Sequence, residues 1–145
     1  MRALCQRVAS ASVDIGGETV AHMDGGLLVL LGVFRDDTEA QAERLATKTL
    51  ALRVFADASK PMNRSVMDVG GSVLVVSQFT LAADTSRGNR PGFGYAAEPK
   101  RARALYEHYV RAIRERWPQV ATGVFGADMQ VSLVNDGPVT ILLEG

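Results

Sequence analysis

The sequence predicts an α+β fold: a single domain over residues 1–145 with a curved, mostly antiparallel or barrel-like β-sheet and two main helices. Strand-like segments rich in apolar and β-branched residues outnumber the two segments with helical spacing. No repeat, low-complexity tract or linker divides the chain. With 145 residues, 47% of them hydrophobic, the chain can bury one core and needs no second domain.

The first half of the chain begins with a predicted β-meander. Residues 3–13 and 18–23 are expected to be strands joined by a turn at Asp14-Ile15-Gly16-Gly17, and residues 27–33 form an apolar run typical of a buried strand. Thr38 then offers an N-cap to a first helix. Its apolar positions recur at helical spacing: Ala42, Leu45, Ala46, Thr49 and Leu50.

The middle of the chain predicts a hairpin. After a short strand at residues 53–55 and a loop over residues 56–62, two strands are expected at residues 64–67 and 72–79, joined through Gly70-Gly71. Residues 82–99 are rich in glycine and proline and predict a long loop, and loops of this length in compact domains are usually functional or disordered.

A second helix is predicted over residues 100–117, stopped by Pro118. Its apolar stripe consists of Ala102, Leu105, Tyr106, Tyr109, Val110 and Ile113, and its opposite face carries Lys100, Arg103, Arg111 and Arg114. Two last strands, residues 129–134 and 139–143, flank Asn135-Asp136-Gly137-Pro138. This composition favours a tight turn, and most X-Pro bonds in folded proteins are trans.

Composition excludes several classes of protein. Cys5, the single cysteine, cannot form an intramolecular disulfide, which indicates a reduced, cytoplasmic setting. The N-terminus lacks the apolar core of a signal peptide, and the longest apolar run, residues 27–31, is too short to cross a membrane, so we expect a soluble protein with no membrane partner.

Metal and cofactor chemistry is not expected either. His22 and His108 are the only histidines, so no zinc-ligand spacing exists, and no phosphate-binding or dinucleotide-binding glycine motif is present. His108 has no nucleophile near it in the sequence, so we interpret it as a surface or packing residue rather than a member of a catalytic triad.

Charge is distributed unevenly along the chain. The formal net charge is zero, but residues 84–116 contain eight basic and four acidic residues, a net charge of +4. This segment is either a solvated helix face or a basic patch that attracts a polyanion.

Two short segments place polar residues at the ends of apolar strands. Ser77 and Thr80 carry hydroxyls that either act as nucleophiles or bind backbone groups, but no base is near them in the sequence. Phe79 is a candidate core residue or a platform for a nucleobase. Gly137-Pro138, near the C-terminus, forms a turn or leaves carbonyl groups exposed to a ligand.

The chain resembles the D-aminoacyl-tRNA deacylase family, also called D-tyrosyl-tRNA deacylases, over essentially its whole length. The resemblance rests on Gln6-Arg7-Val8 and on residues 70–84 and 127–140, which contain the motifs SQFTL (residues 77–81) and NxGPVT (residues 135–140). Cys5 stands where an aliphatic residue is common, which leaves both motifs intact.

The resemblance implies hydrolysis of the ester that joins a D-amino acid to the 3′-terminal adenosine of tRNA. Ser77, Gln78, Phe79 and Thr80 would hold the adenosine and the scissile carbonyl, with backbone N–H groups stabilising an oxyanion. Thr80 is one candidate nucleophile, and the rival scheme uses the 2′-hydroxyl of the tRNA to assist water. Phe125 and Met129 match positions that line the adenosine pocket.

The resemblance also implies how the wrong enantiomer is rejected. Gly137-Pro138 would be cis and would enter the active site of a partner subunit, which makes the enzyme a homodimer, and Arg7 would position this element. Carbonyl groups of the pair would fill the space that an L side chain needs, while glycine, which lacks a side chain, would be accepted. The alternatives are a non-catalytic nucleic-acid-binding module of the same fold and a threonine-dependent hydrolase of small esters.

Overall fold

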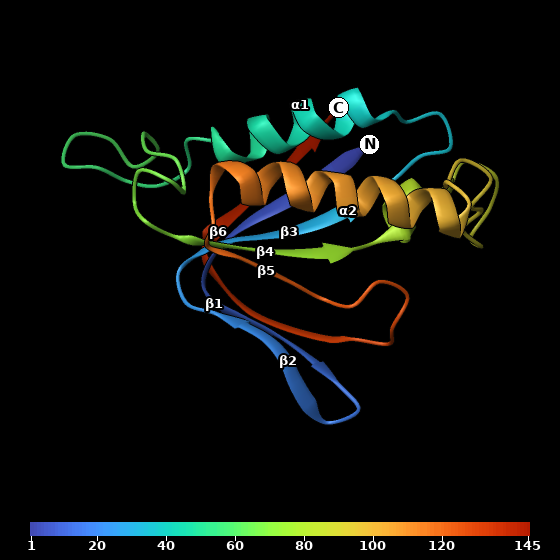
Figure 1. Ribbon diagram of the computed structural model, residues 1–145, viewed down its shortest axis with the longest axis horizontal. Helices are drawn as coiled ribbons and strands as arrows, with labels where there is room; N and C mark the ends of the chain where they lie inside the picture. Colours follow the sequence, from blue (N-terminus) through green and yellow to red (C-terminus); the bar gives the residue numbers. More distant parts are fainter.

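Two helices cover one face of a six-stranded mixed sheet in the computed structural model, which describes residues 1–145 (Figure 1). The strands are β1 (Arg2–Ile15), β2 (Glu18–Met23), β3 (Gly26–Gly32), β4 (Ser72–Ser77), β5 (Val120–Thr122) and β6 (Gln130–Glu144). The helices are α1 (Glu39–Leu50), α2 (Pro99–Arg116) and the short 3₁₀ helix η1 (Phe79–Ala82). Neither long helix has the length and apolar character that crossing a membrane requires.

Strand β1 organises the sheet. It pairs antiparallel with β3 along its first half, with β2 along its second half, and with β6 along both. On the far side of β3 the order continues through β4 to β5, and these two pairings are parallel. Three of the five strand pairs are therefore antiparallel, and the curved sheet is nearly closed, which confirms the predicted α+β class with a barrel-like sheet.

The predicted hairpin before β4 is wrong. Residues 66–70 form a turn, and the one bridge in this part of the chain joins Arg64 to Phe55, so the short strand expected at residues 53–55 does not form either. The physical reason is that both edges of β4 are occupied by parallel neighbours, β3 and β5. The strand also ends at Ser77 rather than at Phe79, where η1 begins.

The expected turn at residues 135–138 is also wrong. Both halves of β6 run antiparallel to β1, so the chain does not reverse there. The register changes from Gln6 opposite Thr140 to Val8 opposite Asn135, which leaves residues 136–139 as a protrusion opposite Arg7. The Gly137–Pro138 bond in this protrusion is cis, the isomer that the family resemblance implies.

The main core lies between the helices and the sheet. Thr38 caps α1 through a capping box with Gln41, and all predicted apolar positions of both helices are buried. At the centre, the hydroxyls of Thr49 on α1 and Tyr109 on α2 are hydrogen bonded at 2.8 Å, and both side chains are fully buried.

This buried pair predicts a stability effect. Replacing Thr49 with Val keeps the shape but leaves the Tyr109 hydroxyl without its partner, so the free energy of unfolding should fall by about 1–3 kcal/mol. Urea denaturation measures this change. Thr47→Val on the exposed side of α1 is the matched control and should change stability by about 0.5 kcal/mol or less. Equal losses in the two variants would contradict the prediction.

Candidate active site

The SQFTL segment lies where β4 leaves the sheet. The apolar run before Ser77 is buried, and the N–H of Gln78 donates to the carbonyl of Leu31 at 2.8 Å, which keeps the chain beside β3. Helix η1 then turns the backbone so that the Phe79 side chain is 56% exposed. Phe79 is therefore a surface aromatic rather than a core residue.

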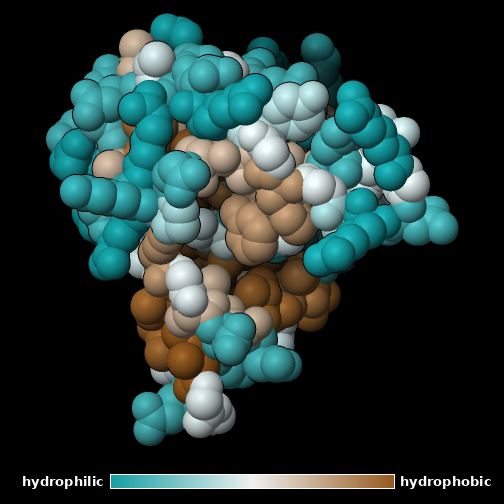
Figure 2. Space-filling view, turned by 90° about the vertical axis from the view of Figure 1, so that its right-hand side faces the viewer, coloured by the Kyte–Doolittle hydropathy of each residue, from teal (hydrophilic) through white to brown (hydrophobic).

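A cavity of about 640 Å³ opens beside this strand end. Five of the predicted site residues line it together: Ser77, Gln78, Phe79, Phe125 and Met129. The start of α2 forms another part of the wall, through Pro99 and Ala102. Figure 2 faces this side of the molecule and shows apolar side chains gathered in a hollow with polar side chains around them.

Phe93 is a lining residue that the sequence reasoning missed. Its ring contacts Phe79 edge-on, with the centroids 5.0 Å apart. The loop that carries it is held by bridges from Asp84 to Gly92 and from Phe34 to Ala96. The available signal was an aromatic residue in a long glycine-rich loop directly after SQFTL.

Thr80 differs from the other predicted residues because it does not line the cavity. Its exposed hydroxyl accepts a hydrogen bond from the side-chain amide of Gln78. No histidine, carboxylate or lysine hydrogen bonds to it, so the hydroxyl has no base to activate it.

The titratable groups elsewhere supply no alternative nucleophile. Burial raises the pKa of the Cys5 thiol to about 12, which keeps it protonated and unreactive at neutral pH. His108 lies between Glu43, at 3.0 Å, and Arg111, at 2.9 Å, in the expected surface and packing role. No group of three His, Cys, Asp or Glu side chains is placed to hold a metal ion.

The protrusion of β6 is fixed from both sides. The guanidinium of Arg7 donates to the carbonyls of Asp136, at 2.8 Å, and Val54, at 2.5 Å. The side-chain amide of Asn135 accepts from the N–H of Val139 at 2.8 Å and donates to its carbonyl at 3.1 Å. Asn135 is thus a second positioning residue; the sequence placed it in a turn and in the NxGPVT motif but indicated no such role.

Gly137 and Pro138 are both exposed at the tip of this protrusion. A Cβ atom added to Gly137 would lie 2.2 Å from the backbone nitrogen of Val139, so the position has no room for a side chain. Neither Gly137, Pro138 nor Arg7 lines the cavity beside SQFTL. Within one chain, the predicted site residues thus fall into two separate groups.

Comparison with known proteins gives the same family over nearly the whole chain. The family model described as D-Tyr-tRNA(Tyr) deacylase matches residues 4–144. Proteins named D-aminoacyl-tRNA deacylase from Variovorax paradoxus (strain S110) and Pseudomonas aeruginosa (strain LESB58) are 60% and 58% identical, each over 99% of both chains.

Two solved structures share the fold. The one titled c-Myc DNA Unwinding Element Binding Protein has a TM-score of 0.95 and 42% identity, covering 100% of this chain and 99% of the other. The one titled as a probable eukaryotic D-amino acid tRNA deacylase has a TM-score of 0.85 at 16% identity, covering 98% of this chain and 97% of the other, which is a likeness of fold alone. With its fold, its motifs and its full-length relatives in agreement, the chain belongs to the D-Tyr-tRNA(Tyr) deacylase family.

Proposed function

We propose that this chain hydrolyses the ester bond of D-aminoacyl-tRNA, releases the free D-amino acid and tRNA, and rejects L-aminoacyl-tRNA. The family assignment makes it a hydrolase that acts on aminoacyl-tRNA. The observation that carries the proposal further is the cavity in which Ser77, Phe79 and Phe125 meet. It combines an apolar wall with a strand end that offers hydroxyl, amide and backbone groups, as a nucleoside ester requires.

The cavity suits the 3′-terminal adenosine. Phe125 and Met129 offer apolar surface to an adenine ring, and the exposed ring of Phe79 offers a stacking face. Ser77 and Gln78 then lie beside the ribose and the scissile carbonyl. The N–H of Phe79, at the start of η1, has no acceptor within the helix and can stabilise the oxyanion.

Water is the proposed nucleophile. Its oxygen attacks the ester carbonyl, the bond from the carbonyl carbon to the ribose 3′-oxygen breaks, and the proton that the water loses passes to that 3′-oxygen. The 2′-hydroxyl of the tRNA orients the water, because Thr80 has no base and lies outside the cavity wall. Thr80 instead holds Gln78 through the hydrogen bond between their side chains.

A homodimer would complete the site. Gly137 and Pro138 protrude far enough to be exposed, yet they do not reach the cavity of their own chain. The outer edge of β6 has no strand partner and exposes Leu133, Val134 and Leu142. Pairing of two such edges would carry each protrusion to the partner's cavity, where its carbonyls exclude an L side chain and leave D-amino acids and glycine accepted.

Substrate chirality gives the first test of this function. D-Tyr-tRNA should be deacylated at least about 100-fold faster than L-Tyr-tRNA, since a steric clash excludes one enantiomer rather than weakening its binding slightly. Release of labelled amino acid measures both rates, and Gly-tRNA should be hydrolysed as well. Equal rates of hydrolysis of the two enantiomers would contradict the proposed steric exclusion of L-aminoacyl-tRNA. Tight tRNA binding with no turnover would favour a non-catalytic nucleic-acid-binding module.

Removal of the 2′-hydroxyl distinguishes a mechanism in which the tRNA assists water from one in which Thr80 is the nucleophile. A D-aminoacyl-tRNA that ends in 2′-deoxyadenosine should react about 100-fold more slowly or worse, because the group that orients water is missing. Thr80→Ala should keep activity within about tenfold of the unchanged protein. Single-turnover rates measure both effects. If Thr80→Ala abolishes hydrolysis while tRNA binding persists, Thr80 is the nucleophile instead.

The exposed edge of β6 provides a test of the dimer. Val134→Asp places a charge on an apolar edge, so the protein should become monomeric and lose hydrolysis of D-aminoacyl-tRNA. Val20→Asp is the matched control, since Val20 is similarly exposed on β2, on the other side of β1. Sedimentation velocity and deacylation assays measure the two properties. A fully active Val134→Asp monomer would contradict a site shared between subunits.

A further inference from the structure

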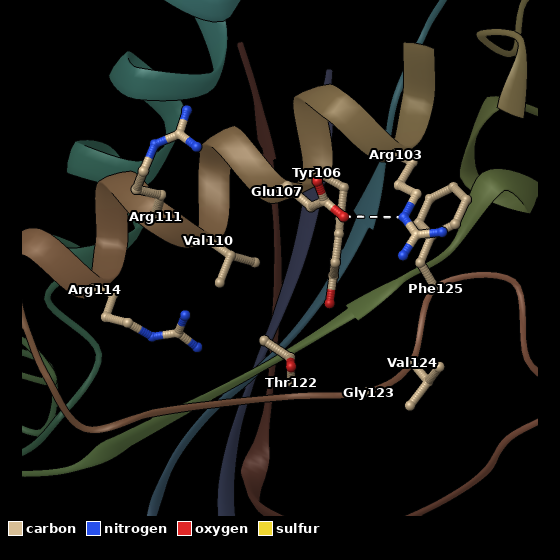
Figure 3. Close-up of a pocket in the computed structure, with 10 residues that line it drawn as sticks. All are labelled: Arg103, Tyr106, Glu107, Val110, Arg111, Arg114, Thr122, Gly123, Val124 and Phe125. Carbon is tan, nitrogen blue, oxygen red and sulfur yellow. Dashed lines mark hydrogen bonds and ion pairs between the residues drawn. The ribbon is translucent and has the colours of Figure 1, made fainter. Parts of the chain in front are cut away.

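A second hollow lies on the other side of Phe125, between α2 and the chain that follows β5 (Figure 3). Its volume is about 470 Å³. Arg103, Arg111 and Arg114 line it from α2, and residues 122–125 form the facing wall. The close-up shows Arg103 reaching toward Phe125 and Arg114 reaching toward Thr122, so the two guanidinium groups stand at opposite ends of the groove.

The groove has an excess of positive charge. Arg114 makes no hydrogen bond or ion pair within the chain, although its charge is close enough to act on the hydroxyl of Tyr106. Arg103 is paired with Glu107 at 3.0 Å, but both side chains are more than half exposed, and such pairs contribute little and exchange readily for a stronger anion. Arg111 turns away toward His108 and adds to the local potential. The residues that line the groove thus include three arginines and one carboxylate, that of Glu107.

The groove and the apolar cavity share a wall. Phe125 lines both of them, and its ring packs against Tyr106 with the centroids 5.8 Å apart. Tyr106 is held in turn by a hydrogen bond from its hydroxyl to the carbonyl of Val75, at 3.0 Å. If the last base of a polynucleotide lies in the cavity, the preceding nucleotides lie next to the groove. The guanidinium groups that line the groove bind phosphates well.

We propose that this groove binds backbone phosphates of the tRNA 3′ end, just before the terminal adenosine, with Arg114 and Arg103 as the phosphate ligands. The placement of the adenosine rests on the proposed function, while the binding of phosphate by the groove rests on its own charge and shape. The groove thereby selects a polynucleotide over a free aminoacyl-nucleoside without touching the reacting ester.

Charge reversal tests the groove. Arg114→Glu should weaken binding of uncharged tRNA about tenfold or more at 100 mM salt, and the slope of log affinity against log salt should become shallower by about 0.7 for each phosphate that the variant no longer neutralises. Fluorescence anisotropy with labelled tRNA measures both. Arg114→Lys keeps the charge and should recover most of the affinity. Arg44→Glu, an equal charge change at an exposed position of α1, controls for net charge and should have a much smaller effect.

A second readout ties the groove to the substrate path. In Arg114→Glu, hydrolysis of D-aminoacyl-tRNA relative to D-aminoacyl-adenosine should fall about tenfold, through KM rather than kcat. Unchanged tRNA affinity and salt slope in Arg114→Glu, or changes equal to those of Arg44→Glu, would overturn the inference. If the unchanged protein hydrolyses neither substrate, the proposed function fails, and the anisotropy result still decides the groove.

Discussion

The pairing of β1 with three strands is the constraint on which the rest of this molecule depends. Its first half is hydrogen bonded to β3 and β6 on opposite edges, and its second half carries β2 in place of β3. Both long helices lie over one face of the sheet that these pairings build (Figure 1). Because β1 also carries Arg7, the strand that sets the architecture fixes the protruding part of β6 as well.

In the proposed reaction, backbone atoms supply much of the chemistry. Phe79 is exposed in the short helix after β4, and Gly137 and Pro138 are exposed at the tip of the protrusion, where the proposal uses their backbone amide and carbonyl groups. Neighbouring side chains hold these segments in place. Asn135 and Arg7 fix the protrusion, and Gln78 and Thr80 fix each other. In the proposed site, the substrate is then selected by its shape around the reacting atoms, without contacts to the amino-acid side chain.

Local signals in the sequence were sufficient for the elements whose stability is local. The apolar stripes of α1 and α2, the N-cap at Thr38 and the buried run of β3 all follow from spacing and capping. The pairing of β4 did not follow, because glycines at residues 70–71 suit a hairpin equally well and parallel neighbours are brought by distant crossovers. The protrusion of β6 was missed for a similar reason: only the register with β1 distinguishes it from a turn.

The residues of the candidate site that match family positions could be predicted, and its other parts could not. Family resemblance pointed to five residues that do meet in one cavity, whereas Phe93 lies in a loop that has no motif. Helical spacing placed Arg103, Arg111 and Arg114 on one face of α2, but it did not show the facing wall that makes this face a groove. Gly137 has a consequence for engineering this surface. Since no Cβ fits at Gly137, the shape of the protrusion at this position cannot be changed by exchanging one side chain for another. A designer who wants a different clearance would have to lengthen or shorten the segment between Asn135 and Val139, and so rebuild the backbone itself.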